Sequence, residues 1–171
     1  MAAKKYISIN AGVLTEVQAT DSSAGAGDAG KIAALDTTGR LSNTMMPVGA
    51  GSETDSIVSS ENLSAGNLVN IWSDVGVTKV RKADATTVGK EANGFVLSAV
   101  TSPAAAVVYR ISQSNTQMSG LTPGSTYYLS TTAGGVVSTP PSASGNIVQS
   151  VGKAFDATTL IFEPKSHIVL A

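Results

Sequence analysis

The sequence predicts an all-β protein, a compact antiparallel β-barrel or sandwich preceded by an extended N-terminal arm. From about residue 52 onward, short runs rich in Val, Ile, Thr and Tyr are separated by Gly, Pro, Asn and Asp, which is the punctuation expected between strands. No apolar stripe with helical periodicity extends beyond two turns. The sequence also divides at this point, because the residues before it are too poor in apolar side chains to form a core.

The predicted β-domain comprises residues 52–171. Its ten short strands are expected near residues 55–59, 68–72, 75–82, 95–100, 105–112, 126–130, 136–139, 147–155, 159–162 and 168–170. Many short strands joined by turn residues favour a barrel or a sandwich over a helical or α/β fold.

A weak internal repeat lies within this domain. Residues 63–71 parallel residues 121–129, and each segment is followed by a Gly-containing turn and a second strand. Residues 93–96 loosely parallel residues 146–148. The repeat indicates two similar halves that close one barrel.

The predicted arm comprises residues 1–51 and ends in the linker Val48–Gly51. It contains a short apolar patch at 6–9 and then a stretch of small residues at 21–30, which cannot build a core. Asp36 to Gly39 predict a tight turn between two short extended pieces. Residues 42–46 predict a single helical turn that Pro47 ends.

Composition narrows the classes of function. The chain has 171 residues, of which 13% are charged, and its formal net charge is −1. Such a neutral surface gives little repulsion between copies and favours an assembly component, while the lack of a basic excess argues against nucleic-acid binding. There is no cysteine, no signal-peptide pattern and no apolar run long enough to span a membrane. We therefore expect a protein that is made in the cytoplasm and binds neither nucleic acid nor membrane.

Each motif or residue that could indicate catalysis or ligand binding lacks the flanking or partner residues that such a function requires. Residues 25–31 fit a glycine-rich nucleotide loop, but Ile32 replaces the required Ser or Thr, and no buried strand or helix is predicted on either side. His167 is the single histidine, no nucleophile elbow occurs, and the carboxylates are scattered. We expect no enzyme activity, no cofactor and no metal.

The candidate partner contacts are the apolar residues of the arm and one basic cluster. Lys79 and Arg81 would share one face of a strand, with Val80 on the other, as a solvated face or as a contact to an acidic patch on a partner in an assembly. The full set of candidate contacts is Tyr6, Ile7, Ile9, Leu35, Leu41, Met45, Met46, Lys79 and Arg81.

Two stretches resemble a known group of proteins. Residues 31–47, KIAALDTTGRLSNTMMP, fit the pattern K-[IV]-x-x-L-[DN]-x-x-G-[KR]-[LI]-x-x-x-[LM]-[LM]-P, which resembles a segment of tailed-bacteriophage virion proteins of the head-decoration and fibre types. Residues 120–162 look similar to the C-terminal β-domain of the same proteins. The resemblance implies a homotrimer on the virion exterior, without cofactor or catalytic residues.

The leading hypothesis is thus a bacteriophage structural protein that decorates and stabilises the outside of the capsid as a homotrimer, with the major capsid protein as its partner. The alternative is a short head or tail fibre module that binds host-surface glycan, and exposed aromatic residues gathered on one loop face would favour it. A hydrolase on the same scaffold has the least support, because no nucleophile, base and orienting group can be named.

Overall fold

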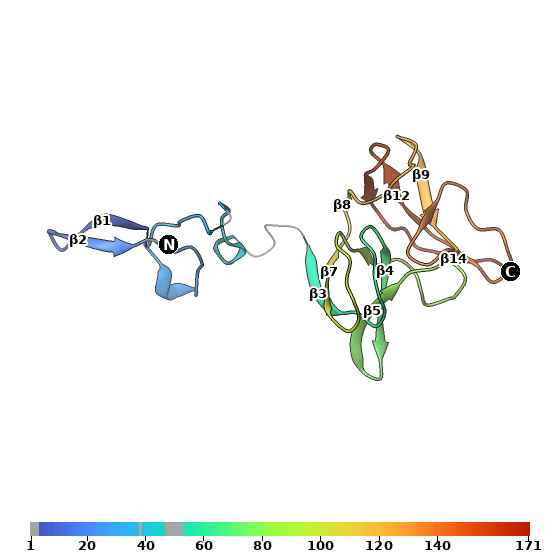
Figure 1. Ribbon diagram of the computed structural model, residues 1–171, viewed down its shortest axis with the longest axis horizontal. Helices are drawn as coiled ribbons and strands as arrows, with labels where there is room; N and C mark the ends of the chain where they lie inside the picture. Colours follow the sequence, from blue (N-terminus) through green and yellow to red (C-terminus); the bar gives the residue numbers. More distant parts are fainter. Residues whose placement is uncertain (1–3, 38, 47–52) are drawn as a thin grey trace. The chain divides into compact units, whose positions relative to one another are not determined.

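The structure is a computed structural model that describes residues 4–37, 39–46 and 53–171. The predicted linker Val48–Gly51 lies outside these residues. The chain forms two compact units, residues 1–51 (unit 1) and residues 52–171 (unit 2). Figure 1 draws unit 1 in blue to cyan and unit 2 in green to red.

Unit 1 begins with a β-hairpin that the sequence analysis did not predict. Strands β1 (Lys5–Asn10) and β2 (Val13–Gln18) pair antiparallel over their full lengths. Ala11 and Gly12 join them with φ of 51° and 82°, the geometry of a two-residue type I′ turn that matches the twist of the strands. The turn is easily missed in the sequence, because alanine replaces the Asn or Asp that usually marks its first position.

The rest of unit 1 consists of turns and short 3-10 helices, η1 (Ala26–Asp28) and η2 (Asn43–Met45). Helix η2 confirms the predicted helical turn over 42–46. The predicted turn at Asp36 is also confirmed, because the Gly39 N–H donates to the Asp36 carbonyl at 3.1 Å. The Arg40 N–H donates to Asp36 Oδ1 at 3.0 Å, so the Asp36 carboxylate fastens the base of the turn.

Unit 2 contains two five-stranded sheets and one two-stranded sheet, and every strand pair in it is antiparallel. The first sheet has the order β3-β7-β6-β4-β5, the second β10-β9-β12-β13-β8, and β11 pairs with β14. The strands of the first sheet are β3 (Thr54–Val58), β4 (Leu68–Asp74), β5 (Val77–Lys82), β6 (Gly94–Phe95) and β7 (Ala105–Tyr109). The others are β8 (Ser114–Asn115), β9 (Thr126–Leu129), β10 (Val136–Val137), β11 (Ile147–Val148), β12 (Ser150–Ala154), β13 (Leu160–Phe162) and β14 (Ile168–Val169).

The all-β prediction is confirmed. Nine of the ten predicted strand regions coincide with observed strands over two or more residues, whereas the region expected over 95–100 meets β6 only at Phe95. Strand β8 was not predicted, and the single strand expected over 147–155 is divided into β11 and β12. The described strands form no closed barrel, so the arrangement agrees with the sandwich alternative.

The two five-stranded sheets repeat one topology. Within β3 to β7, and again within β8, β9, β10, β12 and β13, the sheet order is third, second, fourth, fifth and first strand. The same hydrogen bonds recur 58 residues further along the chain. The Gly66 N–H donates to the Val96 carbonyl at 2.8 Å, and the Gly124 N–H donates to the Ala154 carbonyl at 2.8 Å. The predicted repeat is therefore present in the backbone.

Two details of the predicted repeat are wrong. Gly94 pairs with Val69 on β4, and its counterpart 58 residues later is Gly152, which pairs with Tyr127 on β9. Residues 93–96 therefore correspond to residues 151–154 and not to 146–148. The halves also form separate sheets instead of closing one barrel.

The main core is shared by the two halves. Leu68 and Phe95 from the first sheet and Leu129 and Phe162 from the second are fully buried in one apolar cluster. The Phe95 and Phe162 rings meet edge to face with centroids 5.5 Å apart, a favoured aromatic geometry. A second, smaller cluster lies within the first half, among Leu63, Val69, Val80, Val96, Ala106 and Val108.

Candidate interaction surfaces

Most large apolar side chains of unit 1 are exposed to solvent. None of its described residues is buried. The largest exposed fractions belong to hairpin residues, with 65% for Ile7, 71% for Ile9 and 69% for Leu14. Since a lone two-stranded hairpin is marginally stable in water, these side chains are the first candidates for contact with a partner.

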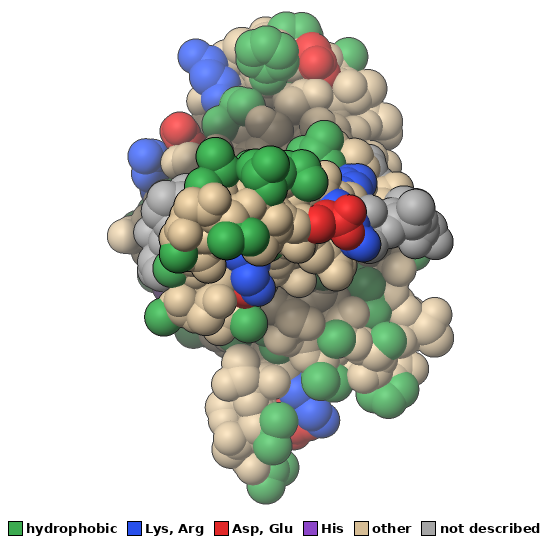
Figure 2. All heavy atoms as spheres, turned by 90° about the vertical axis from the view of Figure 1, so that its left-hand side faces the viewer, with side chains coloured by type: hydrophobic (Ala, Val, Ile, Leu, Met, Phe, Trp, Pro, Cys, Tyr) green, Lys and Arg blue, Asp and Glu red, His purple; other side chains and the backbone are tan. Residues whose placement is uncertain are grey.

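The strand register places these three residues on one side of the hairpin. Ile7 lies opposite Glu16, and Ile9 lies opposite Leu14, and side chains of opposed residues share a face. Lys5 shares this face by alternation and forms an ion pair with Glu16. We call Ile7, Ile9 and Leu14 the hairpin face; Figure 2 shows hydrophobic side chains exposed on the end of the chain that carries it.

The other predicted contacts of unit 1 are distributed differently. Tyr6 lies on the opposite side of the hairpin, where it is half-buried and its hydroxyl accepts the Ile32 N–H at 3.4 Å. Leu35, Leu41 and Met46 are exposed, and Met45 is half-buried.

Leu14 belongs to the hairpin face but was not among the predicted contacts. The signal that reveals it is the alternation of side chains along residues 5–10 and 13–18 around Gly12.

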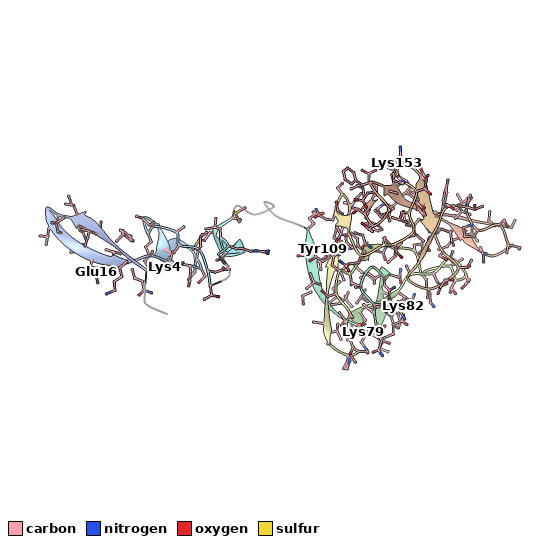
Figure 3. The ribbon with its side chains drawn as sticks, turned by 45° about the horizontal axis from the view of Figure 1, so that its top comes forward. Lys4, Glu16, Lys79, Lys82, Tyr109 and Lys153 are labelled. Atoms are coloured by element: carbon pink, nitrogen blue, oxygen red, sulfur yellow. The ribbon has the colours of Figure 1, made fainter. Side chains whose placement is uncertain are left out.

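Lys79 and Arg81 are the predicted contacts in unit 2. Both are half-buried on β5, and Val80 between them is fully buried, as the alternation predicts; Figure 3 labels Lys79 and Lys82 on this strand. Lys79 pairs with Asp74 at 2.6 Å. The Arg81 guanidinium lies 4.5 Å from the centre of the Trp72 ring.

The Arg81 side chain is further held by neighbouring residues. Its Nε donates to Asn70 Oδ1 at 3.0 Å, and Nη2 donates to the Gly89 carbonyl at 2.8 Å. The cation is engaged within the fold, so its first role is to hold the loop around Gly89 against the sheet.

Two neighbouring hollows on unit 2 form a polar groove that the sequence did not reveal. Two hollows of about 500 and 480 Å³ share Asn93 and Arg110. Arg110 Nε donates to Asp55 Oδ2 at 2.6 Å, and Asn93 Oδ1 accepts the Ile71 N–H at 2.9 Å. These residues come from separate strands and loops, so only the folded chain brings them together.

One end of this groove is lined by the C-terminal segment. His167 Nε2 lies 3.3 Å from Glu91 Oε1. Gln149 accepts the Ala92 N–H at 2.8 Å and donates to the Lys165 carbonyl at 3.3 Å. The lone histidine thus joins the C-terminal segment to the loop before β6.

Two carboxylates are held in their ionised form by local hydrogen bonds. Burial alone would raise the pKa of Asp84, but hydrogen bonds from the Thr86 side chain and N–H and from Lys90 outweigh it and hold the pKa below its ordinary value. The Lys31 ammonium and then the Ala24 N–H lower the pKa of Asp28.

The glycine-rich motif at 25–31 therefore has a local explanation. Its lysine is bound to Asp28, and it contains only the three-residue helix η1.

The described residues contain no group of three or more side chains suited to a metal ion. None of the helices in these residues is long and apolar enough to cross a membrane. No family model, curated protein or solved structure matches the chain.

Proposed function

We propose that this chain is a structural, non-enzymatic protein of a bacteriophage particle, which decorates and stabilises the outside of the capsid as a homotrimer. The observation that carries the proposal is the contrast between the two units. Unit 2 has a core with fully buried aromatic and aliphatic residues, whereas no described residue of unit 1 is buried. A segment that exposes its apolar side chains in this way is expected to cover them against another molecule.

Because residues 31–47 resemble a segment of virion proteins, we expect that partner to be another protein of a bacteriophage particle. The turn at Asp36 and the helical turn η2 lie within this stretch. Leu35, Leu41 and Met46, all exposed, lie at fixed apolar positions of the pattern.

The mechanism follows from mass action. A subunit that binds adjacent capsid proteins buries surface that exists only in the assembled shell, and so shifts the equilibrium toward that shell. The bound copies oppose the pressure of the packaged genome without any chemical step.

The experiment uses particles produced without this protein. Purified protein is added, the particles are sedimented, and bound protein is measured as a function of added protein. We expect saturable binding at a fixed ratio to the major capsid protein, and a higher temperature of genome release from the decorated particles. Failure of the protein to sediment with particles contradicts the proposal.

The polar groove around Asn93 and Arg110 favours a second candidate, a fibre module that binds host-surface glycan. Its polar lining can donate to and accept from sugar hydroxyls. Aromatic residues do not line these hollows, and the strongly exposed Phe155 (72%) belongs to a different loop. Binding of the protein to host cells and not to capsids would favour this candidate.

A further inference from the structure

The second half of unit 2 contains a strand with an unpaired edge. Strand β10 pairs with β9 on one side, and no described residue forms a ladder with its other side. The Leu129 N–H donates to Gln149 on the far side of β9 at 2.9 Å. Its partner Val136 therefore directs its own N–H and C=O away from β9. The N–H of Ser138, which follows β10 in a bend, donates to no backbone acceptor within the described residues.

The first half shows the same position filled. Val80 on β5 lies opposite Ile71, just as Val136 on β10 lies opposite Leu129, the residue 58 positions after Ile71. The Val80 carbonyl accepts the Ser60 N–H at 2.9 Å and the Ser60 hydroxyl at 3.1 Å. Ser59 and Val80 form a parallel bridge. In the first half, the chain itself thus supplies a short extended segment to this edge.

A shorter connection explains why the second half has no such segment. Thr54 and Ser114 begin the first strands of the two halves, and Leu63 and Leu121 occupy equivalent positions after them. The second connection is two residues shorter, so the chain passes β10 without reaching it. A hollow of about 430 Å³ remains, lined by Ser119, Gly120, Leu121, Tyr127 and Val136 to Thr139.

The residues that line this hollow determine which kind of segment can occupy it. Leu121 and Tyr127 are buried and Val136 is half-buried, and none of the lining residues is charged. The outward N–H and C=O of Val136 and the N–H of Ser138 are free to pair with the backbone of an added strand. The fitting occupant is an uncharged extended strand with apolar side chains two residues apart, because alternate side chains of an added strand point to the same face.

Strand β1 of unit 1 has these properties. Residues 6–10 carry no charge, and the charge of Lys5 at the start of β1 is paired with Glu16. Ile7 and Ile9 are two residues apart and 65% and 71% exposed. Its free edge forms no ladder within the described residues. Every copy of the chain therefore carries both an uncovered apolar strand and an unfilled strand position.

We propose that strand β1 of one copy pairs with the free edge of β10 of a second copy, with Ile7 and Ile9 directed at Leu121 and Tyr127. This inference rests on the proposed assembly into homotrimers and identifies two of the surfaces that join the copies. Strand addition of this kind gains affinity from backbone hydrogen bonds and specificity from the alternate side chains.

The test is photocrosslinking in a mixture of two forms of the full-length chain. One form carries p-benzoylphenylalanine in place of Ile7 and natural isotopes, and the other is wild type labelled with ¹⁵N. After illumination, mass spectrometry identifies the linked peptides. The matched control carries the same probe in place of Val75, which is 98% exposed at the tip of the β4–β5 hairpin.

We expect the probe at position 7 to link to ¹⁵N-labelled peptides from residues 119–139, and the probe at position 75 to give no such link. Links from position 7 confined to its own chain, or to hairpins of other copies, overturn the proposal, as does the absence of links.

A second measurement uses the molar mass in solution, from light scattering. Ser138→Pro removes the unbonded Ser138 N–H next to β10 and leaves the β9 ladder intact, whereas Ser138→Ala keeps that N–H. We expect Ser138→Pro to lower the mass toward the 17.2 kDa monomer, with an unchanged urea midpoint from Trp72 fluorescence. An oligomer that persists in Ser138→Pro overturns the strand pairing but leaves the proposed capsid function standing. A monomeric wild type contradicts both.

Discussion

Gly94 and Gly152 provide the most direct test of the repeated fold. They occupy the same place in the two halves, each opposite the second strand of its sheet. A Cβ added at Gly152 would lie 2.0 Å from the Ile161 carbonyl oxygen, and one added at Gly94 would lie 2.6 Å from the Tyr109 carbonyl oxygen. Both contacts are to backbone of the neighbouring strand, which cannot rotate away. We therefore expect both Gly→Ala substitutions to destabilise unit 2.

The expected loss in the free energy of unfolding differs between the two glycine positions. Overpacking costs about 1–3 kcal/mol in a filled core, and Gly152 also has φ of +150°, where an alanine adds strain of about 1–3 kcal/mol. We expect a loss in the free energy of unfolding of about 4 kcal/mol for Gly152→Ala and about 2 kcal/mol for Gly94→Ala. Gly145 has φ of +80° but open space around it, so Gly145→Ala should cost only about 1 kcal/mol.

The assay is urea unfolding followed by the fluorescence of Trp72, the single tryptophan, and by circular dichroism. Gly145→Ala is the matched control, since it introduces the same methyl group at positive φ without the backbone contact. If Gly152→Ala were no more destabilising than Gly145→Ala, β12 and β13 would not approach each other as the structure shows, and the equivalence of the two halves would fail.

Three further predictions concern the arm, one carboxylate and one turn. Deletion of residues 1–47 should leave the circular dichroism of a folded β-domain, since the described residues of unit 1 bury nothing, but should abolish sedimentation with particles; loss of the β signal contradicts this. Asp84→Asn should cost about 1–2 kcal/mol at neutral pH. Because the folded-state pKa of Asp84 lies below its ordinary value, the contribution of this carboxylate is present above the unfolded pKa of about 4 and is lost as the pH falls through the folded value. The difference between wild type and Asp84→Asn in urea titrations should therefore shrink on acidification, and a constant difference refutes the assignment. Gly39→Val should weaken incorporation into particles, because φ is +78° at Gly39 and valine rarely adopts it. Asp36→Asn keeps the oxygen that accepts the hydrogen bond and should have almost no effect on incorporation. If Asp36→Asn abolished another function while incorporation stayed normal, the charge of Asp36 would have a role of its own.

The strands of unit 2 were predictable because their β-branched and aromatic residues and the turn residues between them are local sequence signals. The Gly-containing turns that follow residues 63–71 and 121–129 also marked the repeated hairpins correctly. The second part of the repeat was misaligned because Asn93 and Asn146 look alike in sequence. The actual equivalence depends on Gly94 and Gly152, and their close backbone approach is visible only in the folded sheets.

The hairpin of unit 1 and the polar groove were missed for different physical reasons. The hairpin depends on a turn whose first residue, Ala11, adopts positive φ, which alanine rarely does. The groove depends on Asn93 and Arg110, which are brought together by strand pairing between distant segments. The sequence around each of these two residues contains no pattern that indicates their proximity in the fold.

The proposal that this protein decorates a bacteriophage capsid can be examined by quantitative mass spectrometry of bacteriophage particles purified from cells that produce the protein. We expect the protein to be a particle component at a fixed ratio to the major capsid protein, with a copy number of the same order. A few copies per particle would support the fibre alternative, and absence from the particles would contradict the proposed function.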